Sequence, residues 1–347
     1  MNGLPVLTST VPDSWDAEPL NWGIIGTGWI AERFVAALQA HTRQRVIAVA
    51  ARRAQRAEAF AEEHRLPIAH PDVAALLSDP AVDVVYIATP HPSHADLALA
   101  AIDAGKHVLV EKPLALDAAQ ARQVVSRARA AGVYCAEALW TFFLPRFDVV
   151  RRLIDRGEVG ELCTVLAEYG EYLPDDHRAM DPALAGGSLL DLGTYPIALA
   201  ARWTGRPATV RAVGQTNSQG VNAQTGALIQ DEHGRIAVLY TSLIAGSPTT
   251  ATLIGTDGSI ELPGPFYHPG SILLRSKEGH ARAAFDEPRI GHAGLHFEAA
   301  AVARDIASGR TESPIRPLDD TVTFLELMDT IRAEAGITFD AAKEVAA

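Results

Sequence analysis

Short apolar runs alternate with longer segments of helical spacing from Asn21 to about Ala138. The longer segments place an apolar residue every three to four positions, which is typical of amphipathic helices. Strand and helix units in this alternation favour a parallel sheet covered by helices on both faces. We therefore predict an α/β fold with a doubly wound parallel sheet over this part of the chain. The predicted strands are WGIIG, RVIAVA, PIAH, VDVVYIAT, HVLVEK and GVYCAEA.

The pattern changes in the second half of the chain. From LCTVLAEYGEYL to GSIEL, strand candidates follow one another, separated by turns rich in Gly, Asp, Asn and Pro. Consecutive strands with few helices between them indicate a largely antiparallel sheet, hence an α+β domain. With 347 residues two domains are expected. We predict a polar arm over residues 1–20, a first domain over 21–140 and a second over 141–347.

Composition limits the partners and the compartment. The formal net charge of -12 argues against nucleic acid or an anionic membrane, because both require a cationic face. No apolar run is long enough to span a bilayer, and the first twenty residues do not have the pattern of a signal peptide. Cys135 and Cys163 give neither a disulfide framework nor a metal set. We expect a cytoplasmic protein.

A glycine-rich turn separates the first predicted strand from the first predicted helix. GIIGTGWIAERF matches G-x-G-x-x-A with Gly26, Gly28 and Ala31. Glycine permits the tight turn and a close approach of the backbone to a pyrophosphate, which the N–H groups of the helix N-terminus then bind. The context predicts a dinucleotide-binding Rossmann domain rather than a merely structural turn. The predicted cofactor-binding residues here are Gly26, Thr27, Gly28, Trp29 and Ile30.

The end of the second strand indicates which dinucleotide binds. NAD-specific enzymes usually carry Asp or Glu there, whereas this chain has Ala51 followed by Arg52 and Arg53. Without the carboxylate nothing repels a 2′-phosphate, and a guanidinium binds it through charge-assisted hydrogen bonds. We therefore predict that NADP is preferred over NAD. The alternative, a solvated helix start, is weakened because arginine is unfavourable at a helix N-terminus.

Two further turns leave the predicted sheet at its carboxyl edge, where ligands bind in open parallel sheets. They are YIATPHPSH and VLVEKP. A lysine in such a crevice positions a substrate hydroxyl and favours negative charge on a neighbouring acid, but spacing alone equally allows a surface lysine. His91 and His94 are three residues apart, and no third metal ligand accompanies them, so we predict no metal. The expected crevice residues are Thr89, Pro90, His91, His94, Glu111 and Lys112.

From about Asn21 to Ile337 the chain resembles the glucose–fructose oxidoreductase and inositol dehydrogenase (Gfo/Idh/MocA) family. GIIGTGWIA, ATPHPSH, EKP and AGGSLLDLGTYP stand in the family's order. Within the family, EALWT at Glu137–Thr141 is similar to the dimeric dihydrodiol dehydrogenases and the NADP-dependent aldose (xylose or glucose) dehydrogenases. Many of these relatives have arginine where this chain has Phe142, so the substrate identity is not transferred.

The resemblance implies an NADP-dependent oxidoreductase acting on a CH–OH or C=O group of a sugar, polyol or dihydrodiol. It implies that Lys112 and Tyr195 are catalytic, with Asp191 orienting Lys112 or a substrate hydroxyl. From the residues alone, Tyr195 would be a packed tyrosine and Asp191 a first-turn acid. Since Pro196 removes a backbone donor, we expect a bent or interrupted helix at this motif. Lys112–Pro113 is a candidate cis bond.

The resemblance also implies an open-faced second sheet of the kind often used for subunit association, and hence a homodimer or a dimer of dimers. Trp140, Tyr172 and His177 are candidates for the substrate wall, with ordinary packing or exposure as the alternative for each. Two other functions stay open. One is a non-catalytic dinucleotide-binding regulator, which has no need of a proton-transfer pair. The other is a glycosidase that retains its NAD(P).

Overall fold

The computed structural model describes residues 4–339 and divides them into two compact units. The parallel-sheet unit comprises residues 12–143 and 290–322, and the eight-stranded unit comprises residues 4–11, 144–289 and 323–339. The expected domain boundary is at residue 140, and the first segment of the parallel-sheet unit runs to residue 143. Residues 290–322, which the expected division assigned to the second domain, return to the parallel-sheet unit.

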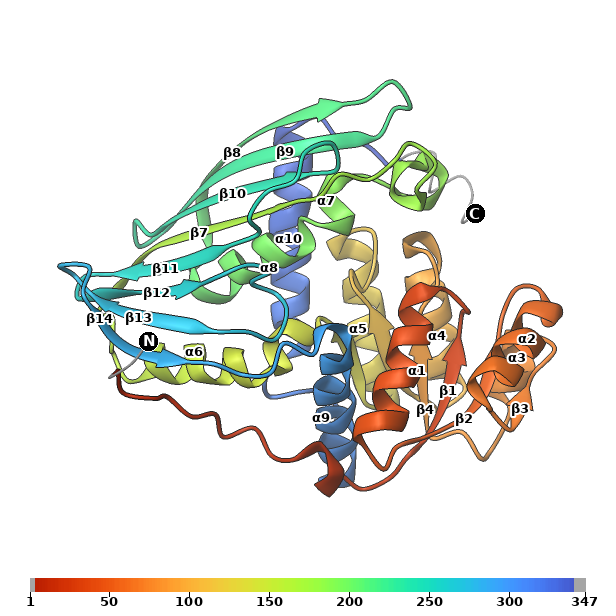
Figure 1. Cartoon of the computed structure of the whole chain (residues 1–347). Coiled ribbons are helices and arrows are strands. Elements are labelled where there is room, and N and C mark those ends of the chain that lie inside the picture. The colour runs from red at the N-terminus through yellow and green to blue at the C-terminus, as the bar shows by residue number, and fades with distance from the viewer. Residues whose placement is uncertain (1–3, 340–347) are drawn as a thin grey trace. The chain divides into compact units, whose positions relative to one another are not determined.

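The parallel-sheet unit is built on six parallel strands in the order β3-β2-β1-β4-β5-β6 (Figure 1). Helices α1 and α2 pack together, as do α4 and α5, and right-handed crossovers place the two pairs on opposite faces. Strands β4 and β6 are buried at every position because both faces are covered. The doubly wound sheet predicted from the sequence is confirmed. The elements are β1 (Asn21–Ile25), α1 (Trp29–His41), β2 (Arg45–Ala50), α2 (Ala54–His64), β3 (Ile68–Ala69), α3 (Val73–Leu77), β4 (Val84–Ile87), α4 (His94–Asp103), β5 (His107–Glu111), α5 (Ala118–Ala131), β6 (Cys135–Ala138) and α9 (His296–Ala307).

The eight-stranded unit has the order β14-β13-β12-β11-β7-β10-β9-β8. Strands β7 and β10 pair in parallel, and the other neighbours pair antiparallel. Helix α8 packs on β7 and β10 and so covers one face (Figure 1). The elements are α6 (Pro145–Asp155), β7 (Leu162–Gly170), α7 (Ser188–Asp191), α8 (Thr194–Trp203), β8 (Pro207–Thr216), β9 (Asn222–Asp231), β10 (Ile236–Ser242), β11 (Ala251–Gly255), β12 (Gly258–Leu262), β13 (Ile272–Ser276), β14 (Ala281–Phe285) and α10 (Leu318–Glu334), which crosses the unit boundary.

Strands β13 and β14 were not predicted. Each has five residues and carries an arginine, so neither shows a sustained alternation of apolar and polar residues. The N-terminal arm lies beside the last of them. Val6 forms a parallel bridge with Ala284, and the Leu7 N–H donates to the Ala284 carbonyl at 2.8 Å. The arm therefore extends the edge of the sheet at this point.

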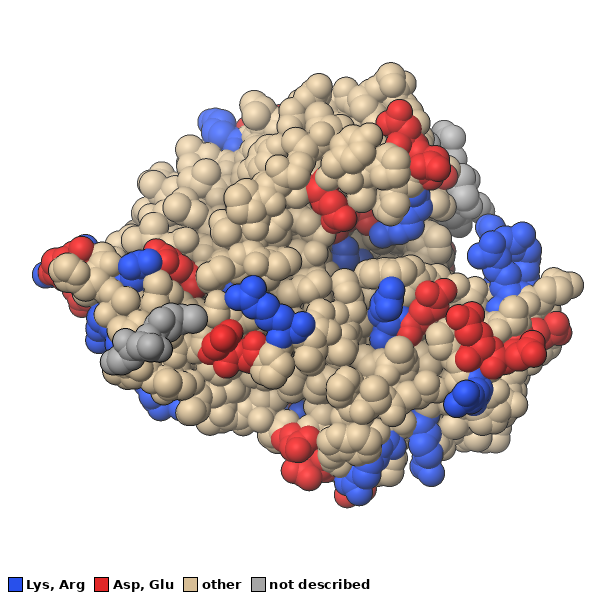
Figure 2. Space-filling model, in the orientation of Figure 1, with Lys and Arg blue, Asp and Glu red and all other residues tan. Residues whose placement is uncertain are grey.

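The second face of the eight-stranded sheet carries exposed apolar side chains. Leu166, Leu228 and Val238 lie in one cross-strand row, since Val238 pairs with both of the others. They are between 38% and 49% exposed, and Val213 on β8 is 75% exposed. Figure 2 shows few charged residues over β8–β10 on the visible surface. The largely antiparallel, open-faced sheet implied by the resemblance is confirmed.

The AGGSLLDLGTYP motif forms two helices rather than one. Helix α7 ends at Asp191 and α8 begins at Thr194. A Cβ on Gly193 would lie 2.5 Å from the Leu189 carbonyl oxygen, so the close approach of the two segments requires glycine. Pro196 lies in the first turn of α8, where an unused N–H costs nothing. The expected interruption at the motif is confirmed.

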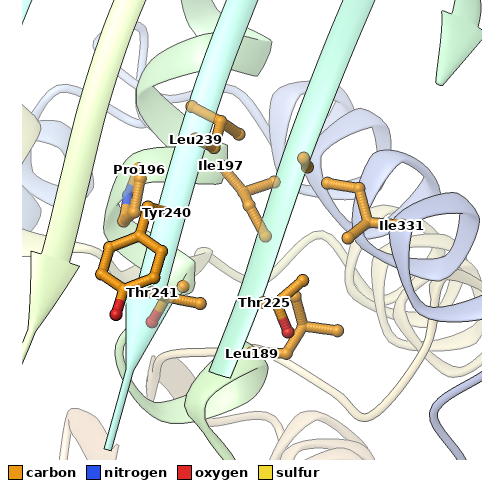
Figure 3. A pocket seen from close by; sticks show the side chains of 10 residues that line it. Leu189, Pro196, Ile197, Thr225, Leu239, Tyr240, Thr241 and Ile331 are labelled. Carbon is orange, nitrogen blue, oxygen red and sulfur yellow. The ribbon is translucent and has the colours of Figure 1, made fainter. Parts of the chain in front are cut away.

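A small apolar pocket lies between α8, the sheet and α10 (Figure 3). Leu189, Pro196, Ile197, Leu239 and Ile331 are among its lining residues. None of the lining side chains is charged, so the pocket belongs to the core beneath the motif helix rather than to a site for a polar ligand.

Among residues 4–339, no helix is long and apolar enough to cross a membrane. Within the same residues, no three His, Cys, Asp or Glu side chains gather as metal ligands would.

Candidate active site

The glycine-rich turn fits a pyrophosphate. Gly26 has φ +106°, and a Cβ there would lie 2.4 Å from the Ala88 carbonyl oxygen, so only glycine fits against the end of β4. Gly28 is the N-cap of α1, and a Cβ there would meet nothing within 4 Å. The helix N-terminus is therefore open to an anion. Thr27 and Trp29 follow in the same turn, with Trp29 53% exposed.

The end of β2 presents two exposed arginines. Ala51 is buried directly after the strand, and Arg52 and Arg53 are exposed. Arg53 is the N-cap of α2 and makes no side-chain capping bond. Among residues 4–339, neither guanidinium forms a hydrogen bond or ion pair, so both can donate hydrogen bonds to a phosphate.

His94 joins the two predicted crevice turns. Its Nε2 lies 2.7 Å from the Thr89 carbonyl oxygen and its Nδ1 lies 2.8 Å from the Pro113 carbonyl oxygen. The ring is fully buried, and His91 is almost as buried beside it. The physical role of His94 is to hold the turn after β4 against the turn after β5. Thr89 is half-buried and Pro90 is exposed, so these two remain candidates for direct contact with a ligand.

The EKP turn is held from both sides. Glu111 is buried and its Oε1 accepts a hydrogen bond from the Tyr86 hydroxyl. The Leu114 N–H donates to Glu137 Oε1 at 3.0 Å. The Lys112–Pro113 bond is cis, as the sequence suggested. Lys112 itself is partly exposed, so the fold fixes the backbone on either side of this side chain while leaving it accessible.

The carboxylate of Glu137 is the centre of a buried polar cluster. Its Oε2 accepts hydrogen bonds from Arg316 Nη2 at 2.5 Å and Nε at 3.0 Å, and from the Thr321 hydroxyl at 3.2 Å. The Arg316 guanidinium also lies 5.4 Å from the centre of the Phe142 ring. Phe142, where the resemblance led us to expect arginine, is therefore next to an arginine supplied by a distant segment. No sequence motif connected Glu137 with Arg316.

Three aromatic rings meet beside the glycine-rich turn. His292 lies edge-on to Trp29, with ring centres 4.7 Å apart, and stacks on Trp140 at 5.5 Å. Burial, with the nearby Arg33, lowers the pKa of His292 to about 4, so the ring is neutral near pH 7. Trp140 is buried within this cluster. The segment around His292, Gly291–Leu295, packs on α1.

Glu298 on α9 was not singled out from the sequence. Its side chain is fully buried, and neither carboxyl oxygen has a hydrogen-bond partner among the residues described. Burial and the nearby Glu111 raise its pKa well above the usual value for glutamate. Burial therefore favours the protonated form of Glu298.

In the eight-stranded unit, Tyr195 belongs to a cluster of three tyrosines. Its ring stacks on that of Tyr267, with centres 4.2 Å apart and planes inclined by 23°. The Tyr169 ring lies 6.0 Å away, and the Tyr169 and Tyr267 hydroxyl oxygens are 2.7 Å apart. The Tyr169 hydroxyl also donates to Glu171 Oε2 at 2.9 Å. Sequence reasoning found Tyr195 but not its neighbours, which come from unrelated segments.

Arg146 holds the loop that carries Tyr267. Its fully buried guanidinium donates to four backbone carbonyls of that loop at 2.8–3.2 Å, and burial lowers its pKa to about 10. The same loop contains a cis Gly264–Pro265 bond. The four acceptors are the carbonyls of Pro263, Pro265, Phe266 and His268.

The other predicted residues of this unit are Asp191, His177 and Tyr172. Asp191 is buried, and its Oδ1 accepts from Arg178 Nη2 at 2.7 Å. His177 Nδ1 accepts from the Ala179 N–H at 3.1 Å and so caps a short 3₁₀ turn. Tyr172 is 70% exposed. None of these contacts involves the tyrosine cluster.

Comparison with known proteins identifies the family. Residues 20–139 match the profile described as "Oxidoreductase family, NAD-binding Rossmann fold", and residues 147–261 match the GFO/IDH/MocA C-terminal domain. The chain therefore belongs to the Gfo/Idh/MocA family of oxidoreductases, as its resemblance indicated, and contains an NAD(P)-binding Rossmann domain.

Named relatives cover nearly the whole chain. Trans-1,2-dihydrobenzene-1,2-diol dehydrogenase of Xenopus tropicalis is 33% identical over 329 residues, and that of Homo sapiens is 33% identical over 334; each alignment covers 92% of this chain and 98% of the relative. Among solved structures, KijD10, a 3-ketoreductase from Actinomadura kijaniata in complex with NADP and TDP-benzene, is 29% identical with a TM-score of 0.81. That match covers 91% of this chain and 98% of KijD10.

Replacing Arg316 by Met should destabilise the parallel-sheet unit strongly. The substitution leaves the Glu137 carboxylate buried without its cation, a loss that typically costs about 3–5 kcal/mol. We expect a fall of this size in the free energy of unfolding, measured by urea denaturation. Arg127→Met is the matched control, since Arg127 pairs with Asp103 on the exposed surface and such pairs contribute little. Equal stability of the two variants would contradict the assignment.

Proposed function

We propose that the protein is an NADP-dependent dehydrogenase that transfers hydride between the nicotinamide and a CH–OH or C=O group of a sugar, polyol or dihydrodiol. The observation that carries the proposal is the EKP turn. Its backbone is held by Glu137 and His94, and its lysine is left accessible at the carboxyl edge of the sheet that carries the glycine-rich turn. A dinucleotide-binding regulator has no use for such a lysine.

The relatives support the substrate class. The curated relatives are named as dehydrogenases of a dihydrobenzene diol, and KijD10 is a ketoreductase crystallised with NADP. Solved variants of KijD10 replace a tyrosine by phenylalanine and a lysine by alanine, the two residue types proposed as catalytic here. A diol and a ketone are the reduced and oxidised sides of one reaction type, so both names fit hydride exchange at a carbon that bears oxygen.

The chain's own residues supply binding and proton transfer, while bound NADP supplies the hydride acceptor. The turn from Gly26 to Ile30 would hold the pyrophosphate, and Thr89, Pro90 and Glu111 would border the cofactor. Lys112 would hydrogen-bond the reacting oxygen, and Tyr195 would take up the hydroxyl proton in oxidation or donate it in reduction. A tyrosine with a pKa of about 10 is a weak base near neutrality, and a nearby ammonium group would favour its phenolate form.

We further propose that Asp191 orients a substrate hydroxyl or Lys112. Its buried carboxylate is held by Arg178 at the break between α7 and α8, four residues before Tyr195. Trp140, Tyr172 and His177 remain proposed substrate contacts. Of these, Trp140 stacks on His292, and Tyr172 is exposed to solvent.

The cofactor preference can be inverted at Ala51. We expect a higher kcat/KM with NADPH than with NADH in the parent, because Arg52 and Arg53 attract the 2′-phosphate and no carboxylate repels it. Ala51→Asp should reduce or reverse the ratio, measured by initial rates with both cofactors. Ala81→Asp, in an exposed turn before β4, is the control and should leave the ratio unchanged. A higher kcat/KM with NADH than with NADPH in the parent would contradict the proposed preference for NADP.

Replacing Lys112 by Met should separate chemistry from cofactor binding. We expect kcat to fall roughly 100-fold or more, in the range of lost acid–base catalysis, while the Kd of NADPH stays within a few-fold. The measurements are turnover in a screen of aldoses, polyols and diols, and NADPH fluorescence titration. Lys277→Met removes an exposed lysine and should change neither. Retained turnover with lost NADPH binding would make Lys112 a cofactor ligand, and NADPH binding without turnover of any substrate in the parent would indicate a regulator.

We propose that the open face of the eight-stranded sheet associates with a second copy of the chain in a homodimer, alone or as half of a dimer of dimers. Leu166, Leu228 and Val238 form an exposed apolar row on three neighbouring strands. Arg211 of β8 lies opposite Leu228 at the end of the row, and Val213 lies two residues further along β8. Burying such a surface against its symmetry-related copy removes apolar area from water on both subunits.

Val238→Arg should weaken this association. A charge in the centre of an apolar interface would lie unpaired in both subunits, so we expect a shift from dimer to monomer at micromolar concentration. Sedimentation velocity provides the mass, and an unchanged Tm at low concentration shows that the subunit itself is intact. Trp15→Arg changes an exposed aromatic of the other unit and serves as the control. A parent that sediments as a monomer would refute the proposal.

A further inference from the structure

We propose that Tyr267 is a positioning residue for Tyr195. The Tyr267 ring stacks on the Tyr195 ring, and the Tyr267 hydroxyl belongs to a hydrogen-bond chain that ends at Glu171. The inference rests on the proposed catalytic role of Tyr195 and adds to it the residues that fix the direction of the phenol. Tyr195, Tyr267, Glu171 and the intervening Tyr169 all lie in the eight-stranded unit.

The stacked pair restrains the catalytic ring. Tyr195 is partly exposed in the first turn of α8, and the nearly parallel Tyr267 ring covers one of its faces at 4.2 Å. Aromatic contacts of this kind contribute beyond simple burial, and they limit rotation of both rings about the Cβ–Cγ bond. The angle at which Tyr195 presents its hydroxyl therefore depends on where Tyr267 lies.

The hydrogen-bond chain has a fixed direction. An ionised carboxylate only accepts, so the Tyr169 hydroxyl donates its proton to Glu171. With that proton used, Tyr169 must accept at the 2.7 Å contact, and Tyr267 donates. Tyr267 is thus committed as a donor to Tyr169 and does not compete with Tyr195 as the acid. Its oxygen can act toward other groups only as an acceptor.

Burial preserves this direction over the working pH range. It raises the pKa of Tyr267 to about 12 and that of Tyr169 further, and the charge of Glu171 adds to both effects. Both tyrosines therefore remain phenols well above neutral pH. Glu171 is exposed, so water stabilises the charge of its carboxylate. The same carboxylate is the last acceptor of the hydrogen-bond chain.

The backbone of Tyr267 is anchored separately. Arg146 binds the carbonyl of Phe266, immediately before it, and that of His268, immediately after it, at 3.2 and 3.1 Å. Tyr267 is consequently held at its main chain by a buried guanidinium and at its hydroxyl by Tyr169 on β7. Tyr267 is therefore fixed both at its neighbouring backbone and at its hydroxyl, and its ring is the one that stacks on Tyr195.

The test compares Tyr267→Leu with Tyr267→Phe in the full chain. Leucine removes the stacked ring, and we expect kcat to fall roughly two- to ten-fold, the range that corresponds to an aromatic pair. Phenylalanine keeps the ring and should restore most of the loss. KM and Kd for NADPH should stay within two-fold of the parent in both variants. Phe285→Leu, which removes a buried aromatic from β14 of the same unit, should change Tm but not kcat.

A double-mutant cycle with Tyr195→Phe shows whether Tyr267 acts through Tyr195. If it does, Tyr267→Leu has no further effect on the residual activity of Tyr195→Phe. Independent, multiplying losses would overturn the inference while leaving the proposed function intact. If Tyr195→Phe is as active as the parent, the proposed role of Tyr195 fails, and the inference fails with it. Should Tyr267→Leu not fold, Tyr169→Phe replaces it in the cycle, with the same criterion applied to its loss of kcat.

Discussion

The buried carboxylate of Glu137 is the contact on which the parallel-sheet unit depends. It binds Arg316 and Thr321 from the returning segment and, through its other oxygen, the Leu114 N–H of the EKP turn. A buried charge must be paired. If the segment that supplies Arg316 detached, the Glu137 carboxylate would stay buried without its cation, at a large cost in free energy. One ion pair thus ties the correct return of residues 290–322 to the shape of the turn that carries Lys112.

Much of the fold could be predicted because its signals are local. The strand–helix alternation through Ala138 and the glycine-rich turn each depend on neighbouring residues, and both are confirmed. The interruption of the helix at the AGGSLLDLGTYP motif was predictable for the same reason, although the break falls at residues 192–193, before Pro196. Strands β13 and β14 were not predicted because they are short and carry arginines, so their apolar pattern is weak.

The supporting contacts of the site could not be predicted, because they join segments far apart in the chain. Tyr169 and Tyr267 are 98 residues apart, and Glu137 and Arg316 are 179 residues apart. Motifs identify residues that act on a ligand, whereas residues that hold them in place have no fixed spacing. At His94 the motif predicted a histidine that faces the ligand. In the structure its two ring nitrogens lie within hydrogen-bond distance of two backbone carbonyl oxygens.

The parallel pairing of β7 with β10 has a consequence for how this fold can vary. Parallel neighbours require a long crossover, and here the crossover from residue 171 to residue 235 contains α7, α8, β8 and β9. Tyr195 therefore lies in the crossover between β7 and β10 and not in a strand of the sheet. Insertions between β7 and α7 would alter the approach to Tyr195 without shifting the register of any strand. New substrates can be accommodated in this segment while the pairing that stabilises the unit stays the same.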